Sequence, residues 1–512
     1  MKGKRLFVNT LIVSLASVLF RLMGLGFQIF LASRMGPGGI GLFQLVMSVN
    51  VFMATLAISG IRFAATRVIS EKIGRGQSGD LRPTVRCALG YAFTAGTFAF
   101  LIIFLISGFL GERVIGDART VLSLRILGVS LPFVSGGAAL SGYFTGVCRP
   151  GKGALGAFSE QVIKIIVSCI LLSLAPHDDL ELTCAAVVTG NTVGEILSFF
   201  VYLWLYRRDV GGEESGGGEG KRLIFHRLSS VAVPLALAAY ARTALNTVQN
   251  LLIPKGLERS GATRDGALSD YGKIQGMVFP IITFPQIIFQ SVSELVVPEL
   301  TEEQVRGRGD VIESSSRILL KLCLVFSVGV MGALYASADL MGDVFYRGEN
   351  VAAHIRELSF LMPIMYMDTV TDGMLRGLGQ HMYSMKLNIV DSLLSSALVI
   401  ILLPRFAVRG YIVILYASEI FNFTFSILRL SKLTRLPGLV PDILKTLFCA
   451  LGAGSLTQLL LKRAEGGWAV LLAALTVYTA AYCVCVLLLE GKISLNKALV
   501  SGNSKCVSAK EE

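Results

Sequence analysis

Charged side chains are scarce in this chain. Asp, Glu, Lys and Arg make up 16% of its 512 residues, whereas hydrophobic residues make up 53%. Soluble globular domains carry about 25% charged residues, and the mean hydropathy of this chain is +0.66. The scarcity of charge therefore excludes a soluble globular domain and predicts a membrane protein.

Catalytic and metal-binding motifs are also missing. The chain has four histidines, none in an HExxH motif, and nine cysteines without a CxxC pair. It has no G-x-S-x-G motif, and "SGGGEGKR" lacks the first glycine and the final Ser or Thr of a P-loop. These absences argue against an enzyme, a resident cofactor and ATP-driven transport by this chain alone. If energy is used, it is expected from an ion gradient, with Na⁺ or H⁺ as the coupling ion, or from the membrane potential.

Long apolar runs recur along the whole sequence. About 20 apolar residues are needed for a helix to cross a ~30 Å hydrocarbon core. Fourteen such runs lie near 6–31, 39–61, 87–108, 120–145, 155–175, 183–206, 229–252, 274–298, 315–337, 355–376, 386–403, 410–428, 443–461 and 468–489. The sequence therefore predicts an all-α polytopic membrane protein with 14 transmembrane helices.

Lys and Arg predict the orientation of these helices. Most of the 47 basic residues lie at the termini and in the even-numbered connections, and basic segments stay on the cytoplasmic side. Both termini are therefore expected in the cytoplasm. The net charge of +12 is explained by this topology, and no basic patch with interleaved aromatics points to nucleic acid.

An internal repeat divides the chain. At an offset of 231, Gly142 falls on Gly373, Gly146 on Gly377, and Glu160 on Asp391. Because six spans is an even number, the repeats are expected to be parallel, related by a pseudo-two-fold along the membrane normal. The predicted parts are a six-helix lobe at 1–210, a flexible cytoplasmic linker at 211–228, a second lobe at 229–430, a helix pair at 431–490 and a cytoplasmic tail at 491–512.

Arginines within or near the spans are candidate substrate-binding residues, since a charge inside a membrane usually faces a cavity or a partner. Arg21 lies sixteen residues beyond Arg5, about 24 Å along a helix, too deep for easy snorkelling to the cytoplasm. Arg62 at the end of the second span is equally well explained as an interfacial anchor. Arg125, near the start of the fourth span, is equally well explained by snorkelling.

The seventh span carries a polar stripe. Arg242, Asn246, Gln249 and Asn250 are spaced i, i+4, i+7 and i+8, which places them on one helix face. Such a face is expected to line a water-filled cavity, where Asn246, Gln249 and Asn250 would bind polar groups of a substrate, or to form hydrogen bonds with neighbouring helices.

Acidic side chains inside the later spans suggest two further roles. Glu160 and Lys164 are four residues apart with the acid first, the favourable order for an ion pair. They are expected to form a structural clamp, or a gate that exchanges partners during transport. Asn388 and Asp391 offer oxygen ligands for a Na⁺ ion or a proton.

Several stretches resemble a known family. "SGIRFAATRVISE" at 59–71, "GYFTG" and "SEQVIK" within 142–164, "YGKIQGMVFPIITFP" at 271–285 and "LVVPEL" at 295–300 resemble the stage V sporulation protein B group of oligosaccharide flippases. That group is related to the lipid II flippases and to the multidrug exporters of one superfamily. The chain departs from the group's pattern at Arg62, where proline is usual, and at Lys164, where arginine is frequent.

The resemblance implies a flippase of the bacterial cytoplasmic membrane that moves a polyprenyl-diphosphate-linked saccharide, such as a cell-wall precursor, by alternating access. It also implies that arginines of the first lobe bind the diphosphate; Arg21 matches best and Arg242 less closely. Cell-wall synthesis enzymes are the expected protein partners. The alternatives are a cation-coupled multidrug exporter, which the lack of acids in the first four spans opposes, and a scaffold that transports nothing.

Overall fold

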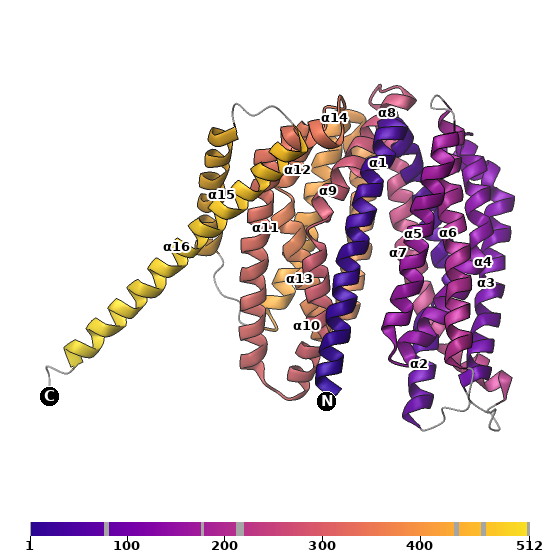
Figure 1. Ribbon diagram of the computed structural model, residues 1–512, viewed down its shortest axis with the longest axis horizontal. Coiled ribbons are helices and arrows are strands. Elements are labelled where there is room, and N and C mark those ends of the chain that lie inside the picture. Colours follow the sequence, from indigo (N-terminus) through magenta and orange to yellow (C-terminus); the bar gives the residue numbers. More distant parts are fainter. Residues whose placement is uncertain are drawn as a thin grey trace. The chain divides into compact units, whose positions relative to one another are not determined.

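The computed structural model describes residues 2–75, 81–175, 179–210, 220–434, 440–461 and 467–508. Most of the predicted linker, 211–219, and the last residues of the predicted tail lie outside them. The described residues form α-helices with two π-helical segments, η2 (Leu110–Ile115) and η3 (Gly272–Val278) (Figure 1). The α-helices are α1 (Lys2–Ile58), α2 (Ile61–Gly74), α3 (Leu81–Phe109), α4 (Thr120–Gly146), α5 (Pro150–Leu174), α6 (Leu180–Asp209), α7 (Lys221–Arg259), α8 (Arg264–Tyr271), α9 (Phe279–Thr283), α10 (Ile287–Val305), α11 (Gly309–Phe345), α12 (Ala352–Ser359), α13 (Met362–Gly377), α14 (His381–Ser431), α15 (Val440–Leu461) and α16 (Trp468–Ser508).

The described helices confirm the predicted polytopic fold. Ten are long and apolar enough to cross a membrane, or eleven when the bent pair over Arg264–Thr283 and Ile287–Val305 counts as one span. Two of the long helices each consist of two helical segments, because α1 is broken at Gly36 and α14 at Ala407, where φ is positive. The bent pair adds one segment to the ten, the second halves of α1 and α14 add two, and the shorter α13 adds one. The described chain thus supplies the fourteen predicted segments.

The chain divides into two compact units. The first comprises Met1–Met277 and Ser392–Ile414, and the second comprises Val278–Asp391 and Leu415–Glu512. This division differs from the lobes at 1–210 and 229–430, because α7 and the start of the eighth span belong to the first unit. The lobe division rests on the internal repeat and stays a prediction.

In the first unit, α3, α4, α5 and α6 lie side by side (Figure 1), and α4 packs against α2, α3 and α6. Small residues allow the close approach. A Cβ atom on Gly96 would lie 2.4 Å from Ser135 Oγ, and one on Gly190 would lie 2.0 Å from Ser168 Oγ. Because hydrocarbon is as apolar as leucine, such close packing, rather than the hydrophobic effect, holds membrane helices together.

The same helix crossing occurs in both units. In the first, Ser70 Oγ donates to Gly146 O at 3.2 Å and joins α2 to α4. In the second, Thr301 Oγ1 donates to Gly377 O at 2.7 Å and joins α10 to α13. Both residues of the second pair lie 231 positions beyond those of the first, which is the offset of the repeat. The repeat therefore preserves a specific tertiary contact as well as residue types.

The break in α1 lies beside α8 and η3, within the first unit. Gly36 adopts φ 65° and ψ 175°, and Pro37, which lacks an N–H, begins the second half of the helix. Beyond the break the two backbones touch, because a Cβ on Gly272 would lie 2.0 Å from Pro37 O and one on Gly41 would lie 2.1 Å from Leu268 O. Gln28 Nε2 also donates to Gly276 O at 3.1 Å.

Candidate functional site

A cavity of about 500 Å³ lies in the first unit, among α1, α2, α4, α5 and α6. This volume falls within the range of ligand sites. Apolar walls are contributed by Phe20, Ile58 and Phe133, among others. The polar and charged lining residues are Arg62, Ser141, Thr145, Glu160, Glu195, Ser198 and Tyr202. A helix bundle that is otherwise apolar thus encloses hydroxyl groups and charges of both signs.

Two glutamates from adjacent helices meet at this cavity. Glu160 on α5 accepts from Ser198 Oγ at 3.4 Å, and Glu195 on α6 accepts from Asn191 Nδ2 at 2.9 Å. Lys164 lies one turn beyond Glu160 and interacts electrostatically with both carboxylates. The structure therefore places the predicted Glu160 and Lys164 in a three-residue charged cluster, and their role as clamp or gate stays a prediction.

The candidate arginines have different positions. Arg62 lines the cavity. Arg21 is exposed on α1, next in sequence to Phe20, which lines the cavity and stacks on Phe158 with ring centroids 5.6 Å apart. Arg242 is exposed on α7 and does not line this cavity of the described chain.

Arg125 lies away from this cavity. Its Nε donates to Ser107 Oγ at 3.0 Å, and its guanidinium lies 5.7 Å from the ring centroid of Phe104. Phe104 is 47% exposed and neighbouring Val129 is also 47% exposed, so this face of α3 and α4 is the outer surface of the unit. A position on this surface matches the alternative in which Arg125 snorkels to the membrane interface.

The polar stripe on α7 contacts neighbouring helices. Asn250 Nδ2 donates to Ser48 Oγ at 3.1 Å, and Asn246 Oδ1 accepts from Ser392 Oγ at 3.2 Å. Thr247, between them, donates to Ser48 O at 3.0 Å. Of the two alternatives for the stripe, helix-to-helix hydrogen bonding accounts for both asparagines, and Gln249 is half-buried beside them.

A second cavity, of about 320 Å³, lies in the second unit. Its lining includes Gln286, Asp368, Asp372, Asn388 and Ser426. Asp372 pairs with Arg376, one helical turn further along α13, at 3.5 Å.

The predicted cation ligands lie at and beside this second cavity. Asn388 lines it, and Asp391 accepts from Ser418 Oγ at 2.8 and 2.9 Å. Asp391 also interacts electrostatically with Asp368 and Glu419. Within the described part of the chain, no three His, Cys, Asp or Glu residues are arranged to hold a metal ion. The Na⁺ or proton site therefore stays a prediction.

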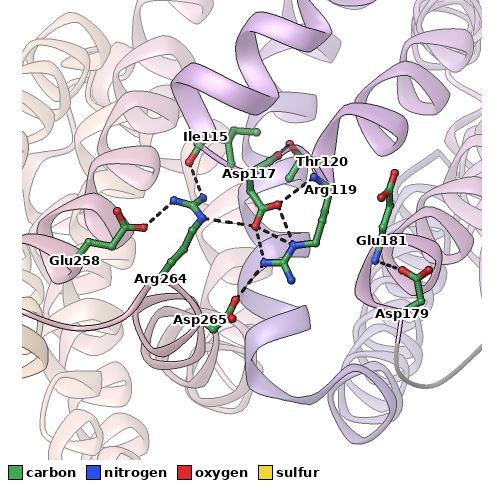
Figure 2. A network of polar contacts seen from close by, with 9 residues as sticks. All are labelled: Ile115, Asp117, Arg119, Thr120, Asp179, Glu181, Glu258, Arg264 and Asp265. Carbon is green, nitrogen blue, oxygen red and sulfur yellow. Dashed lines mark hydrogen bonds and ion pairs between the residues drawn. The ribbon is translucent and has the colours of Figure 1, made fainter.

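A network of ion pairs joins the connection before α4 to α8 (Figure 2). Asp117 accepts from Arg119 Nη2 at 2.7 Å and lies 3.6 Å from Arg264 Nε. Arg119 reaches Asp265 at 3.2 Å, and Arg264 donates to Glu258 at 2.8 Å and to Ile115 O at 2.9 Å. The Asp117 side chain is 5% exposed, whereas both arginines are about one-third exposed.

The arginines change the acidity of Asp117. Burial by itself raises the pKa of this carboxyl, but the hydrogen bonds and charge of Arg119 and the charge of Arg264 outweigh burial and lower the pKa below its ordinary value. Asp117 is therefore held as a carboxylate at neutral pH. The network joins the connection before α4 to the first turn of α8, and Arg119 and Asp265 within it are 146 residues apart in the sequence.

A multi-pass bundle of apolar helices that encloses charged cavities is typical of membrane transporters. The sequence pattern of the family described as "Polysaccharide biosynthesis protein" matches residues 6–288. Because this match covers more than half of the chain, the chain belongs to that family.

Similar proteins agree with this assignment. Stage V sporulation protein B of Bacillus subtilis is 21% identical over 403 residues, which cover 78% of this chain and 77% of the relative. The solved structure "Lipid II flippase MurJ, inward closed conformation" superposes with a TM-score of 0.71 at 14% identity, over 94% of this chain and 99% of that one. A multidrug resistance MATE family transporter superposes with a TM-score of 0.61 at 14% identity, over 81% and 95%. The chain is thus a transporter of the superfamily that holds these flippases and exporters.

Sequence reasoning missed two parts of this arrangement. Glu195 was not among the predicted site residues, yet it shares the cavity with Glu160. Asn191 and Glu195, four residues apart on a membrane helix, carried a signal comparable to that of Glu160 and Lys164. The Asp117 network was missed because Arg264 and Asp265 join Asp117 and Arg119 from α8, far along the sequence.

Proposed function

We propose that this protein is a flippase that moves a polyprenyl-diphosphate-linked saccharide across the bacterial cytoplasmic membrane by alternating access. The observation that carries the proposal is the cavity among α1, α2, α4, α5 and α6, which combines Arg62 with a set of hydroxyl groups inside an apolar bundle. Arginine binds phosphate oxygens through paired N–H groups, and hydroxyls bind sugars. Family membership and the relatives support the same reading.

The proposed roles follow from position. Arg62 holds the diphosphate in the cavity, and Arg21 holds it from α1, beside the lining residue Phe20. Arg242 on α7 is a further candidate. Glu160 and Lys164 form the clamp or gate, and Gln249 meets the saccharide from α7. Both termini lie in the cytoplasm, as the basic connections predict. Cell-wall synthesis enzymes are the proposed protein partners.

A competition experiment tests this function. The purified protein is offered lipid II, undecaprenyl phosphate and the cationic dye ethidium together, and bound species are measured by native mass spectrometry. Preferential binding of lipid II is the expected result. Preference for ethidium would replace the flippase proposal with that of an exporter, and binding of none of the three would favour a scaffold.

Substituting Arg21 by alanine is expected to weaken lipid II binding about tenfold, since one charge-assisted hydrogen bond contributes roughly 1.5 kcal/mol or more. Affinity is measured in nanodiscs for the wild type and the variant. Arg113→Ala, which removes an exposed arginine from the connection before α4, is the control and should bind normally. Equal loss in both variants, or no loss in Arg21→Ala, would contradict a diphosphate contact at Arg21.

Coupling to a cation is proposed at Asn388 and Asp391. Asp391→Asn is expected to abolish the dependence of transport on a Na⁺ or H⁺ gradient, because an amide cannot supply the negative charge that a cation requires. Transport is followed in proteoliposomes with each gradient imposed separately. Asp372→Asn, from the cavity that Asn388 lines but paired with Arg376, should keep the dependence. A wild type indifferent to both gradients would remove the proposed site.

The multidrug exporter is the second candidate function. The sequence opposed it because the first four spans contain no acid, but α5 and α6 bring Glu160 and Glu195 to the cavity. Two carboxylates there could meet a cationic drug. The ethidium result of the competition experiment decides between the two.

A further inference from the structure

We infer that the first-unit cavity selects headgroups that carry a free ammonium group, which Glu160 and Glu195 bind on the wall formed by α5 and α6. The inference rests on the proposed function and names the chemical class of its cargo. The lipid-linked saccharide would then be an amino sugar, or a saccharide whose attached peptide has a free amine, with its phosphate toward Arg62.

The charges on this wall do not balance. Glu160 and Glu195 are close enough to repel each other, and Lys164 interacts with both. One ammonium group faces two carboxyl groups, so these three residues cannot give each carboxyl a cationic partner of its own. A charge in the interior of a membrane bundle needs a partner, because leaving it uncompensated costs several kcal/mol.

Glu195 has a free acceptor for such a partner. Its Oε1 accepts from Asn191, but its Oε2 is fully buried and has no hydrogen-bond partner among the described residues. The Ser130 hydroxyl, which lies within hydrogen-bonding reach of the Glu195 carboxyl, donates to Leu127 O at 2.8 Å. Buried carboxylate oxygens are normally hydrogen-bonded, so an unpartnered one indicates a site that a ligand completes.

The cavity has room for a group larger than a proton or a bare ion. Its volume of about 500 Å³ lies between the carboxylates and the remaining walls, where Ser141 and Thr145 supply hydroxyls. Tyr202 interacts electrostatically with both Glu160 and Arg62, so charges of opposite sign lie within reach of one side chain. A headgroup with an amine at one end and a phosphate at the other matches this arrangement.

The second repeat lacks this combination. At the offset of 231, Arg62 corresponds to Ser293, Lys164 to Ser395 and Glu160 to Asp391. Glu195 corresponds to Glu419 at an offset of 224, because the loop before it is shorter in the second half. The mixed charge is therefore a property of the first-unit cavity and does not follow from the shared helix framework. A binding site is a sufficient reason for one repeat to differ from the other in this way.

A pair of ligands that differ only at the amine tests the inference. Undecaprenyl-diphosphate-glucosamine and its N-acetylated form are titrated into the full-length protein in nanodiscs. The wild type is expected to bind the amine about tenfold more tightly, which corresponds to ~1.4 kcal/mol. In Glu195→Gln and in Glu160→Gln this ratio should fall to about one. Glu181→Gln, on the same helix as Glu195 but in its first turn, should keep the ratio.

Each outcome separates the inference from the proposed function. Tight binding of both ligands with a ratio near one in the wild type would overturn the amine site and leave the flippase intact. Binding of neither ligand would overturn the flippase proposal itself. Because the ratio is measured within each variant, a general loss of affinity does not imitate the expected result. If one glutamine variant fails to fold, the other decides.

Discussion

Gly272→Val is expected to prevent the first unit from assembling, with a large loss of folded protein. The Cβ of any side chain there would lie 2.0 Å from Pro37 O and 2.8 Å from Gly41 N, both backbone atoms that cannot rotate away. Overpacking commonly costs about 1–3 kcal/mol, and a clash between two backbones exceeds that range. The measurement is the monodisperse fraction on size-exclusion chromatography after detergent extraction, which should fall several-fold.

The same helix break provides the matched control. Gly38 has nothing within 4 Å of a Cβ position, three residues before Gly41, whose Cβ would lie 2.1 Å from Leu268 O. Gly38→Ala should therefore behave like the wild type, or gain up to ~1 kcal/mol from helix propensity, whereas Gly41→Ala should share the defect of Gly272→Val. Normal yield of both Gly41→Ala and Gly272→Val would show that the contact of α1 with α8 and η3 is not needed for folding.

Asp117→Asn is expected to lower stability by about 2–3 kcal/mol at pH 7. Removing one partner of a buried ion pair costs ~3–5 kcal/mol. The loss expected here is smaller than that range, because Arg119 and Arg264 are about one-third exposed and water partly screens their charges. The thermal midpoint of the detergent-solubilised variant should fall by several degrees. Glu112→Gln, an exposed acid in the same connection, should leave the midpoint unchanged.

The same substitution predicts a pH dependence. The pKa of Asp117 is lower in the folded protein than in the unfolded chain, where it is about 3.9. Its stabilisation is therefore complete above that value and is lost as the pH falls through the folded pKa. The difference in thermal midpoint between wild type and Asp117→Asn should be constant from pH 8 to about 5 and should shrink below about pH 4. A constant difference down to pH 3 would assign the stabilisation to another group.

The Asp117 network is also where local sequence carries little information. Asp117 and Arg119 lie in one short connection and their spacing allows a pairing to be predicted, but Arg264 and Asp265 join them from the first turn of α8. Short polar connections have no periodicity, so their partners are decided by which helix ends meet. Arg125 shows the same limit inside a span, because a single charge does not reveal which way its helix is turned.

Taken by itself, the sequence determined the class of protein, the fourteen apolar segments and the internal repeat. A ~30 Å hydrocarbon core requires about 20 apolar residues from each span whatever the neighbouring helices are, so length and hydropathy suffice. Only the tertiary structure decided that Arg62, Glu160 and Glu195 share one cavity while Arg125 lies over Phe104. The rotation of each membrane helix about its axis is set by contacts with its neighbours, such as the glycines between α1 and α8. Those contacts join residues far apart in the chain, and no local pattern records them.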